Sequence, residues 1–303
     1  MKMMHTSGFT ESERINYLPI IYSNVLTSLR AIFEKINMLD ESISCTTDVK
    51  CVENYIDKLQ QAGGLLKGVT NIPQNISQSI AVILADNKIK YYVANAHHYG
   101  FSDSASYFFD NFQRISGPKY VPSVDDIIRS RVKTVGVYEI EFVYKSFRFQ
   151  LTDVGGQKSE RRKWLYCFQD CDMVLFVASL CDYCSTMEED SETNRFDDSL
   201  SIFRTLLANQ IFSSTTFVLI LNKSDLFEKT IKSKPLSSVF PDYKGDDSFH
   251  SSCQYILDKF LKLNTDENRY IYHHITCATD SLNVEFVFRS VADSLIKDEL
   301  NMI

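Results

Sequence analysis

The residues best suited to chemistry in this 303-residue chain come directly after an apolar run. Residues 217–221 are uniformly apolar, and Asn222-Lys223-Ser224-Asp225 follows them. Open α/β sheets bind ligands at the carboxyl ends of such strands. A carboxylate such as Asp225 can accept both the N1–H and the N2–H2 donors of guanine, a donor pair that adenine lacks. The segment therefore predicts a guanine site, although the same residues also suit an ordinary polar turn that caps a helix.

A second segment follows a predicted strand at residues 147–152 and consists of Asp153-Val154-Gly155-Gly156-Gln157. It has the form of a Walker-B aspartate that leads into a glycine loop. Asp153 can hold Mg²⁺ through water, and Gln157 can orient an attacking water. The Gly156 N–H can approach a γ-phosphate because no Cβ intervenes. The alternative is an ordinary Asp and Gly-Gly turn between a strand and a helix.

The first part of the chain must supply helices, because residues 15–129 show helical periodicity and no convincing strand. One apolar face recurs at helical spacing in Ile21, Val25, Leu29, Ile32, Phe33 and Ile36. A break is expected at Gly117-Pro118. Ser123 is a good N-cap for a further helix that leads out of this region.

From Val137 onward the apolar period changes to two, which predicts a hairpin that turns near Lys145-Ser146. Strands and helices then alternate. We expect strands at residues 173–180, 216–221 and 270–277, and helices at 199–209, 252–263 and 284–300. This alternation predicts an α/β fold with a largely parallel sheet and helices on both of its faces.

Composition excludes several classes of protein. The net charge of −7 argues against a nucleic-acid binder, because phosphate neutralisation needs clustered Lys and Arg. The eight cysteines are irregularly spaced and no secretory signal is evident, so we expect free cytosolic thiols. The longest apolar runs are too short to span a bilayer.

Two further segments complete a recognisable set. Arg129-Ser130-Arg131-Val132-Lys133-Thr134-Val135-Gly136 lies where the helical part ends, and Thr276-Cys277-Ala278-Thr279 ends the last predicted strand. In order and spacing, the four segments resemble switch I, switch II, the base-recognition segment and the second base loop of heterotrimeric G-protein alpha subunits. The resemblance covers essentially the whole chain.

The resemblance implies a Ras-like P-loop GTPase-type domain with a mostly parallel sheet, plus an inserted all-α helical domain. We expect residues 1–12 to be a remnant of the first Ras-like helix, 13–130 to be the helical domain and 131–303 to be the Ras-like domain. GTP or GDP and Mg²⁺ are the implied ligands.

Alpha subunits are a standard example of phosphoryl transfer with an arginine supplied in cis. By resemblance, Arg131 takes that role and Gln157 positions the attacking water. Thr134, and Asp153 through water, would hold Mg²⁺, and the Ala278 amide would face the base. The implied nucleotide-lining residues are Asp103, Ser104, Ile128, Arg129, Ser130, Arg131, Val132, Lys133, Thr134, Asp153, Val154, Gly155, Gly156, Gln157, Asn222, Lys223, Ser224, Asp225, Cys277, Ala278 and Thr279.

The implied function is a GTP/GDP switch that couples G-protein-coupled receptors to effectors and hydrolyses GTP. Expected partners are the beta-gamma dimer, a receptor, and an effector or regulator of G-protein signalling. We expect no nucleic acid, and only peripheral membrane contact at the inner face of the plasma membrane. Lys158, Arg161, Arg162 and Lys163 would form a basic helix that contacts beta-gamma or effectors, although such a helix can also simply face solvent.

The chain also departs from the family. No match to the phosphate-binding G-x-x-x-x-G-K-[ST] loop occurs in these 303 residues, and Met1-Lys2-Met3-Met4-His5 resembles the helix that follows that loop. We therefore expect an N-terminally truncated alpha subunit without the phosphate cradle or the glycine for myristoylation. The alternative is a P-loop-less, non-enzymatic interaction protein that keeps switch II and the partner-binding surfaces.

Overall fold

The computed structural model describes residues 8–63, 69–168, 171–187, 190 and 192–301. Most of the expected helix remnant at 1–12 lies outside the described residues. The chain divides into two compact units, Met1–Lys133 and Thr134–Ile303. Each unit has its own hydrophobic core, one among the helices and one around the sheet. No helix within the described ranges is long and apolar enough to cross a membrane.

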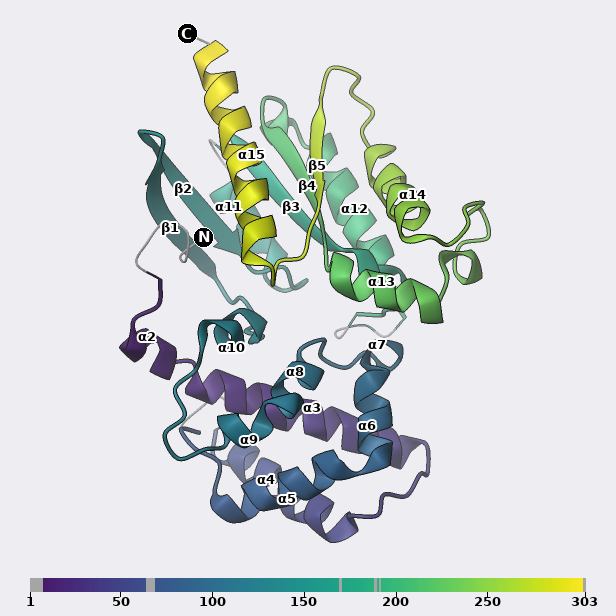
Figure 1. The fold of residues 1–303 in the computed structure, drawn as a ribbon. Helices are drawn as coiled ribbons and strands as arrows, with labels where there is room; N and C mark the ends of the chain where they lie inside the picture. The colour runs from purple at the N-terminus through teal and green to yellow at the C-terminus, as the bar shows by residue number, and fades with distance from the viewer. Residues whose placement is uncertain (1–7, 64–68, 169–170, 188–189, 191, 302–303) are drawn as a thin grey trace. The chain divides into compact units, whose positions relative to one another are not determined.

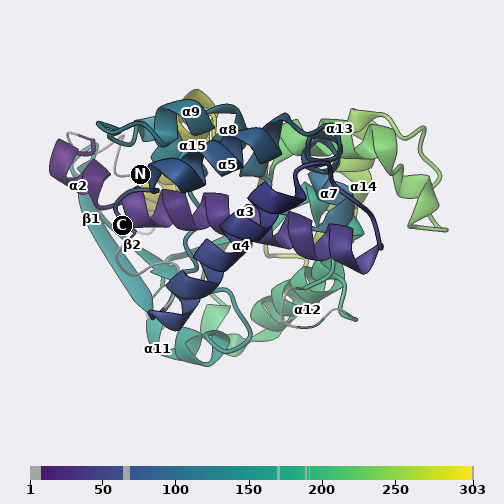
Figure 2. The same cartoon turned by 90° about the horizontal axis from the view of Figure 1, so that it is seen from below.

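The first unit is all-helical, as its periodicity predicts (Figure 1). Its helices are α2 (Glu11–Ile15), α3 (Leu18–Met38), α4 (Thr46–Gln61), α5 (Gln74–Ala85), α6 (Asn87–Ala94), α7 (Ala96–Tyr99), α8 (Ala105–Asp110), α9 (Phe112–Ile115) and α10 (Val124–Arg129). Helix α3 lies along the unit, and α4 and α8 contact it (Figure 2). The predicted apolar face of α3 is confirmed, because all six of its residues are at most 1 % exposed.

Helix α10 begins with a capping box, which confirms Ser123 as its N-cap. The Asp126 amide donates to Ser123 Oγ at 3.2 Å, and the Ser123 amide donates to Asp126 Oδ2 at 2.7 Å. A reciprocal pair of this kind satisfies two backbone donors that the first turn of a helix leaves unpaired. The cap therefore fixes where α10 starts, at Val124, and the helix runs for six residues to Arg129.

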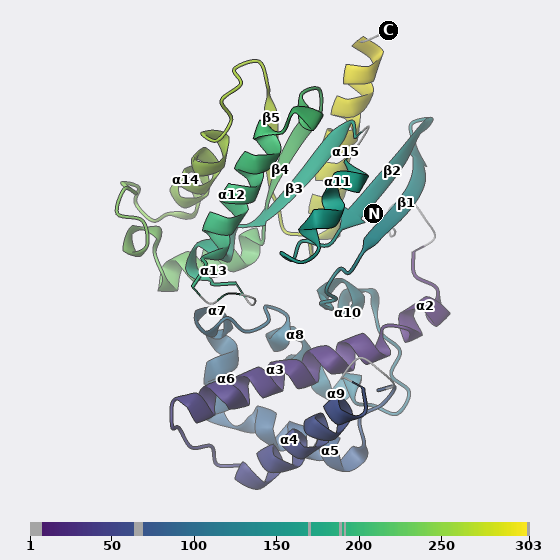
Figure 3. The same ribbon diagram turned by 180° about the vertical axis from the view of Figure 1, so that it is seen from behind.

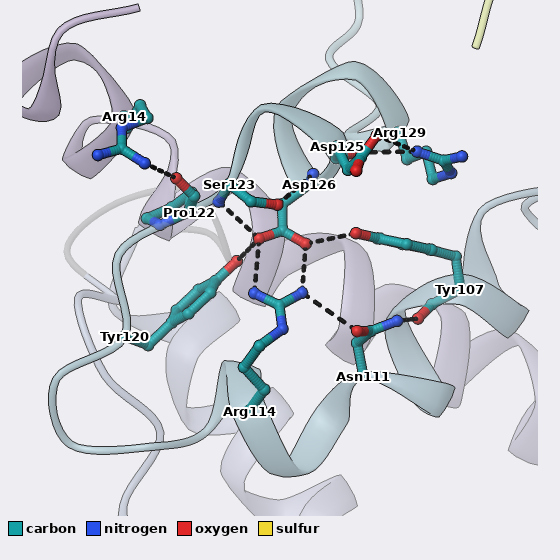
Figure 4. A network of polar contacts seen from close by, with 10 residues as sticks. All are labelled: Arg14, Tyr107, Asn111, Arg114, Tyr120, Pro122, Ser123, Asp125, Asp126 and Arg129. Atoms are coloured by element: carbon teal, nitrogen blue, oxygen red, sulfur yellow. Dashed lines mark hydrogen bonds and ion pairs between the residues drawn. The ribbon is translucent and has the colours of Figure 1, made fainter. Parts of the chain in front are cut away.

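Asp126 also anchors α10 to the rest of the helical unit (Figure 4). Its side chain is fully buried, and its two oxygens accept bidentate bonds of 2.7 and 2.9 Å from Arg114. The hydroxyls of Tyr107 and Tyr120 donate to the same carboxylate at 2.8 and 2.9 Å. A buried carboxylate is tolerated only when its charge is paired and its oxygens are hydrogen-bonded, and this network meets both conditions.

The second unit contains two sheets. Its strands are β1 (Val137–Tyr144), β2 (Phe147–Val154), β3 (Met173–Ser179), β4 (Thr216–Asn222) and β5 (Ile271–Ile275). Strands β1 and β2 form an antiparallel hairpin, while β3, β4 and β5 are parallel in that order. The predicted parallel sheet is therefore confirmed for three strands. Within the described residues no ladder joins the two sheets.

Helices cover both faces of the parallel sheet. They are α11 (Trp164–Cys167), α12 (Arg195–Ala208), α13 (Ser224–Ser233), α14 (Phe249–Leu261) and α15 (Ser281–Asn301). Short 3₁₀ turns lie at Arg161–Lys163, Leu180–Cys184, Gln210–Phe212 and Leu236–Ser238. Figure 1 shows α15 on one face, and Figure 3 shows α12 and α14 on the other. Alternate β4 residues serve the two layers, because Val218 packs with α15 and Leu219 belongs to the core on the opposite side.

The predicted hairpin turn is confirmed at Lys145 and Ser146, whose φ angles of 46° and 70° match the two positive-φ positions of a tight hairpin. Across the strands, the rings of Phe142 and Phe149 stack at 5.5 Å. Phe288 of α15 packs edge-on against Phe142, also at 5.5 Å. The last helix therefore contacts the hairpin as well as the parallel sheet.

The helices predicted at 199–209, 252–263 and 284–300 begin three or four residues earlier than expected, and one further helix was not predicted. The helix expected at 199–209 begins earlier, at Arg195, because the Asn194 side chain caps it by accepting from the Phe196 amide at 2.8 Å. Helix α13 was not expected, yet it begins inside the predicted guanine segment. The helix was not predicted because its first turn is polar, and apolar residues recur at helical spacing only after it.

Replacing Asp126 with Asn should destabilise the protein by about 3 kcal/mol at pH 7, because the buried end of the Arg114 pair loses its charge. Burial alone would raise the pKa of Asp126, but the hydrogen bonds from Arg114, the Ser123 amide, Tyr107 and Tyr120 outweigh it and hold the pKa well below its usual range. The charge therefore stabilises the fold above about pH 4, and this contribution is lost as pH falls further. Urea unfolding from pH 7 to 3 measures it.

Asp125→Asn is the matched control, because the neighbouring Asp125 pairs with Arg129 at 3.0 Å while its side chain stays 68 % exposed. Exposed pairs contribute less than about 1 kcal/mol. If both variants were equally stable at pH 7, or if the gap between Asp126→Asn and the wild type did not narrow in acid, the role given to Asp126 would be wrong.

Candidate functional site

The predicted guanine segment and the second base loop meet at the carboxyl edge of the parallel sheet. Asn222 is the last residue of β4, and its Oδ1 accepts from the Ala278 amide at 2.9 Å and from Thr276 Oγ1 at 3.2 Å. Ser224 N donates to Thr276 O at 3.0 Å, so backbone bonds join the same two segments. The structure therefore brings together two sets of residues that lie more than fifty positions apart in sequence. It also shows the Ala278 amide, expected to face the base, donating to Asn222.

The second base loop is ordered by its own hydrogen bonds. The Cys277 amide donates to Asn283 Oδ1 at 3.1 Å, which fixes the loop to the first turn of α15. The thiol of Cys277 lies 3.2 Å from Thr279 Oγ1. All eight cysteines of the chain, Cys277 included, are free.

Lys223 adopts a left-handed conformation, with φ 67° and ψ 39°, directly between β4 and α13. A non-glycine residue there costs on the order of 1 kcal/mol, and such strain is concentrated at functional sites. The turn places Asp225 in the first turn of α13, where its side chain is exposed. Within the part of the chain that the structure describes, the Asp225 carboxylate makes no hydrogen bond or ion pair. It is therefore available to a ligand.

The expected metal ligands also lie together. Asp153, near the end of β2, is exposed, and Thr134 Oγ1 makes a long hydrogen bond of 3.5 Å to its Oδ2. Two adjacent oxygens of this kind fit Mg²⁺, which prefers hard oxygen ligands and keeps several waters. The described residues contain no group of three or more His, Cys, Asp or Glu side chains that could hold a metal by themselves.

Gly155, and not Gly156, is the sterically constrained glycine of the loop. A Cβ at Gly155 would lie 2.7 Å from Thr134 O and 2.8 Å from Glu160 Cβ, whereas a Cβ at Gly156 would meet nothing within 4 Å. Trp164 Nε1 donates to the Gly155 carbonyl at 2.8 Å, which fixes the same residue from the other side. From the sequence alone, we expected Gly156 to be the glycine at which a missing Cβ permits close approach, in that case of a γ-phosphate. The dense packing around Gly155 could only be found in three dimensions.

Arg161 does not face solvent as part of a basic helix, so that alternative is wrong for this residue. Its Nε donates to Gly156 O at 3.1 Å, and its guanidinium forms bonds of 3.0 and 2.6 Å to Asp198 of α12. The two side chains are only 22 % and 16 % exposed. The pair therefore connects the glycine loop to α12. Residues 161–163 form a 3₁₀ turn, and Lys163 pairs with Glu160 at 2.6 Å.

Gln157 is half-buried just before this turn, and its carbonyl accepts from the Glu160 amide at 2.9 Å. The loop thus holds the Gln157 backbone in place. Together, Thr134, Asp153, Gly155, Gly156 and Gln157 form one continuous region of the second unit.

The remaining predicted residues belong to the helical unit. Arg131 is exposed, and both its backbone amide and its carbonyl bond to Asn24 of α3. Ser130 Oγ donates to Ile127 O at 2.7 Å, and the Arg129 guanidinium lies 4.6 Å from the Tyr107 ring centre. The other members of this set are Asp103 and Ser104, which precede α8, half-buried Ile128, and exposed Val132 and Lys133. Sequence reasoning missed Asn24, because nothing near it in sequence indicates a partner.

Gly155→Ala should lower the free energy of unfolding by about 1–3 kcal/mol, because the added methyl group meets a backbone oxygen and the Glu160 side chain at less than contact distance. Gly156→Ala should change it by less than about 0.5 kcal/mol, since open space surrounds that position. Urea denaturation of the two variants side by side measures the difference. Equal stability of the two would contradict the packing described for Gly155.

Comparison with known proteins agrees with this geometry. A family model described as "G-protein alpha subunit" matches residues 1–295. The chain is 36 % identical over 303 residues to the Guanine nucleotide-binding protein G(o) subunit alpha of Caenorhabditis elegans, covering 99 % of the chain and 84 % of the relative. It is 34 % identical over 302 residues to a Guanine nucleotide-binding protein subunit alpha of Cochliobolus heterostrophus, covering 100 % and 84 %. The predicted fold class, a Ras-like domain with an all-helical insertion, is thereby confirmed. The chain belongs to the G-protein alpha subunit family.

Proposed function

We propose that this chain acts as a guanine nucleotide switch that binds GTP and GDP at the carboxyl edge of its parallel sheet. The observation that carries the proposal is the Asn222 junction, because it fixes the two base-contacting segments together and leaves the Asp225 carboxylate exposed beside them. In this proposal residues 13–130 form the inserted helical domain, and residues 131–303 form the nucleotide-binding domain.

Each side chain in the proposed mechanism acts on the nucleotide or on water. Asp225 accepts the N1–H and N2–H2 donors of guanine. Gln157 orients the water that attacks the γ-phosphate, and Arg131 stabilises the negative charge that develops on the transferred group. Thr134, and Asp153 through water, would hold Mg²⁺, which supplies charge neutralisation at the phosphate oxygens.

The same proposal includes partners. The Arg161–Asp198 pair links the loop that carries Gln157 to α12. A movement of this loop on loss of the γ-phosphate would therefore change the position of α12 on the surface of the second unit. We propose that a beta-gamma dimer and effectors read this region, that a receptor promotes nucleotide exchange, and that the protein acts at the inner face of the plasma membrane. The exposed side chain of Arg162 is available in this region for acidic partners.

A second candidate function is a non-enzymatic interaction protein that keeps the partner-binding surfaces. The observation that favours it is the absence of a G-x-x-x-x-G-K-[ST] match from these 303 residues. In proteins that have this loop, its backbone amides and its lysine cradle the phosphates. Tight, Mg²⁺-dependent binding of GTP by the 303-residue chain would exclude this candidate.

Asp225→Asn should weaken GTP binding roughly 100-fold, because an amide replaces one acceptor oxygen with a donor and loses two charge-assisted hydrogen bonds to guanine. The new donor matches the C2 oxygen of xanthine, so the variant should prefer XTP. Competition binding with GTP, ATP and XTP measures the change.

Glu228→Gln is the matched control, since Glu228 is an exposed carboxylate on the same helix that pairs with Lys232 at 3.6 Å. It should leave the GTP preference unchanged. Unaltered GTP affinity in Asp225→Asn would contradict the proposed base site.

Gln157→Leu should slow single-turnover GTP hydrolysis by at least about 100-fold without abolishing GTP binding, because the side chain acts on the attacking water. Gln150→Leu makes the same substitution at an exposed position of β2 and should hydrolyse GTP at the wild-type rate. If the two variants hydrolysed GTP equally fast, Gln157 would not have the proposed role.

A further inference from the structure

The backbone of Arg131 is held by a single side chain from a distant part of the helical unit. The Arg131 amide donates to Asn24 Oδ1 at 2.6 Å, and Asn24 Nδ2 donates to the Arg131 carbonyl at 3.0 Å. The two residues are 107 positions apart in sequence, and both belong to the unit Met1–Lys133. One carboxamide thus satisfies both backbone groups of one residue, because it carries a donor and an acceptor side by side.

Asn24 is itself fixed, because it projects from the most deeply buried helix of the unit. Its neighbours Val25 and Leu26 are 0 % exposed. Tyr22, also on α3, donates through its hydroxyl to Ile115 O at 3.2 Å and so ties the helix to α9. A side chain on such a helix has a well-defined position, since moving it would require repacking the core.

Arg131 is also constrained from the preceding side. The Ser130 amide and hydroxyl both bond to Ile127 O, at 3.1 and 2.7 Å, which ends α10 in a defined way. The buried Asp126 in turn anchors α10. The backbone on the N-terminal side of Arg131 is therefore fixed by α10. The Arg131 backbone itself is fixed by Asn24. The backbone that carries the long Arg131 side chain therefore has little conformational freedom.

We propose that Asn24 is a positioning residue for GTP hydrolysis, which fixes the backbone from which Arg131 reaches the γ-phosphate. This inference rests on the proposed role of Arg131. A misplacement of about 1 Å at a reacting group can reduce a rate by about 100-fold, so a device that fixes the base of a flexible side chain has a measurable effect. Asn24 contributes no group to the reaction itself, and its effect passes entirely through Arg131.

The experiment compares Asn24→Ala with the wild type of the full chain. Hydrogen exchange of the Arg131 amide should accelerate at least about 10-fold, because its acceptor is gone. Single-turnover GTP hydrolysis should slow by about 10-fold or more, with GTP affinity unchanged. Thr27→Ala is the matched control, since Thr27 lies one turn further along α3 and is exposed. Among the described residues, its hydroxyl bonds to the Ser23 and Asn24 carbonyls of its own helix. It should change neither measurement.

A double-mutant cycle with Arg131→Ala separates the inference from the function on which it rests. If Arg131→Ala alone leaves hydrolysis unchanged, the proposed role of Arg131 is wrong. If Arg131→Ala slows hydrolysis but Asn24→Ala does not, the inference about Asn24 is wrong. In the Arg131→Ala background, Asn24→Ala should slow hydrolysis by less than about twofold, whereas a full multiplicative loss would overturn the positioning role.

Asn24→Asp covers the case in which the alanine variant is poorly folded. The carboxylate keeps the acceptor for the Arg131 amide but cannot donate to its carbonyl. This variant should hydrolyse GTP more slowly than the wild type, because the Arg131 carbonyl loses its donor. A folded Asn24→Asp variant that hydrolyses GTP at the wild-type rate would overturn the inference.

Discussion

The parallel alignment of β3, β4 and β5 is the constraint on which the proposed nucleotide-binding edge depends. The register pairs Ser179 with Asn222 and Leu221 with Ile275, so the three strands end together and the segments that follow them share one edge. Strand β4 can occupy the centre because it is apolar along its length, with helices on both faces. A polar residue in the middle of this strand would be buried without a partner, whereas at its end Asn222 finds partners in the next loop.

The glycine loop is governed by a different constraint, the lack of space around Gly155. The Thr134 carbonyl on one side and Glu160 on the other leave no room for a side chain, while Trp164 holds the Gly155 carbonyl. A Cβ at the next residue, Gly156, would meet nothing within 4 Å, and Arg161 links the Gly156 carbonyl to Asp198 of α12. The loop thus combines a rigid first glycine with a less crowded second one, which suits a segment expected to respond to a phosphate group.

In the helical unit, a buried charged residue fixes the segment that leads to Arg131. Asp126 is fully buried, and its cost of desolvation is offset by Arg114, two tyrosines and a backbone amide. The network holds α10 to α8 and α9, and Arg131 follows α10 directly. Asn24 then holds Arg131 from α3. Two independent attachments from the helical core therefore define where this arginine begins.

The sequence by itself determined the features that are local. The apolar run before Asn222, the period-two hairpin around Lys145, the Ser123 cap and the apolar face of α3 each depend on neighbours within a few residues, so all were predicted correctly. The spacing of the four motifs also predicted the family, because motif order is a property of the chain.

Only the tertiary structure decided the contacts between distant residues. The pairing of Asn24 with Arg131 spans 107 positions, and that of Arg161 with Asp198 spans 37. The crowding of Gly155 depends on Thr134 and Glu160, which approach it only in the folded loop. The physical reason is that hydrogen-bond partners and packing space are set by which surfaces the core brings together, and periodicity along the chain carries no information about them.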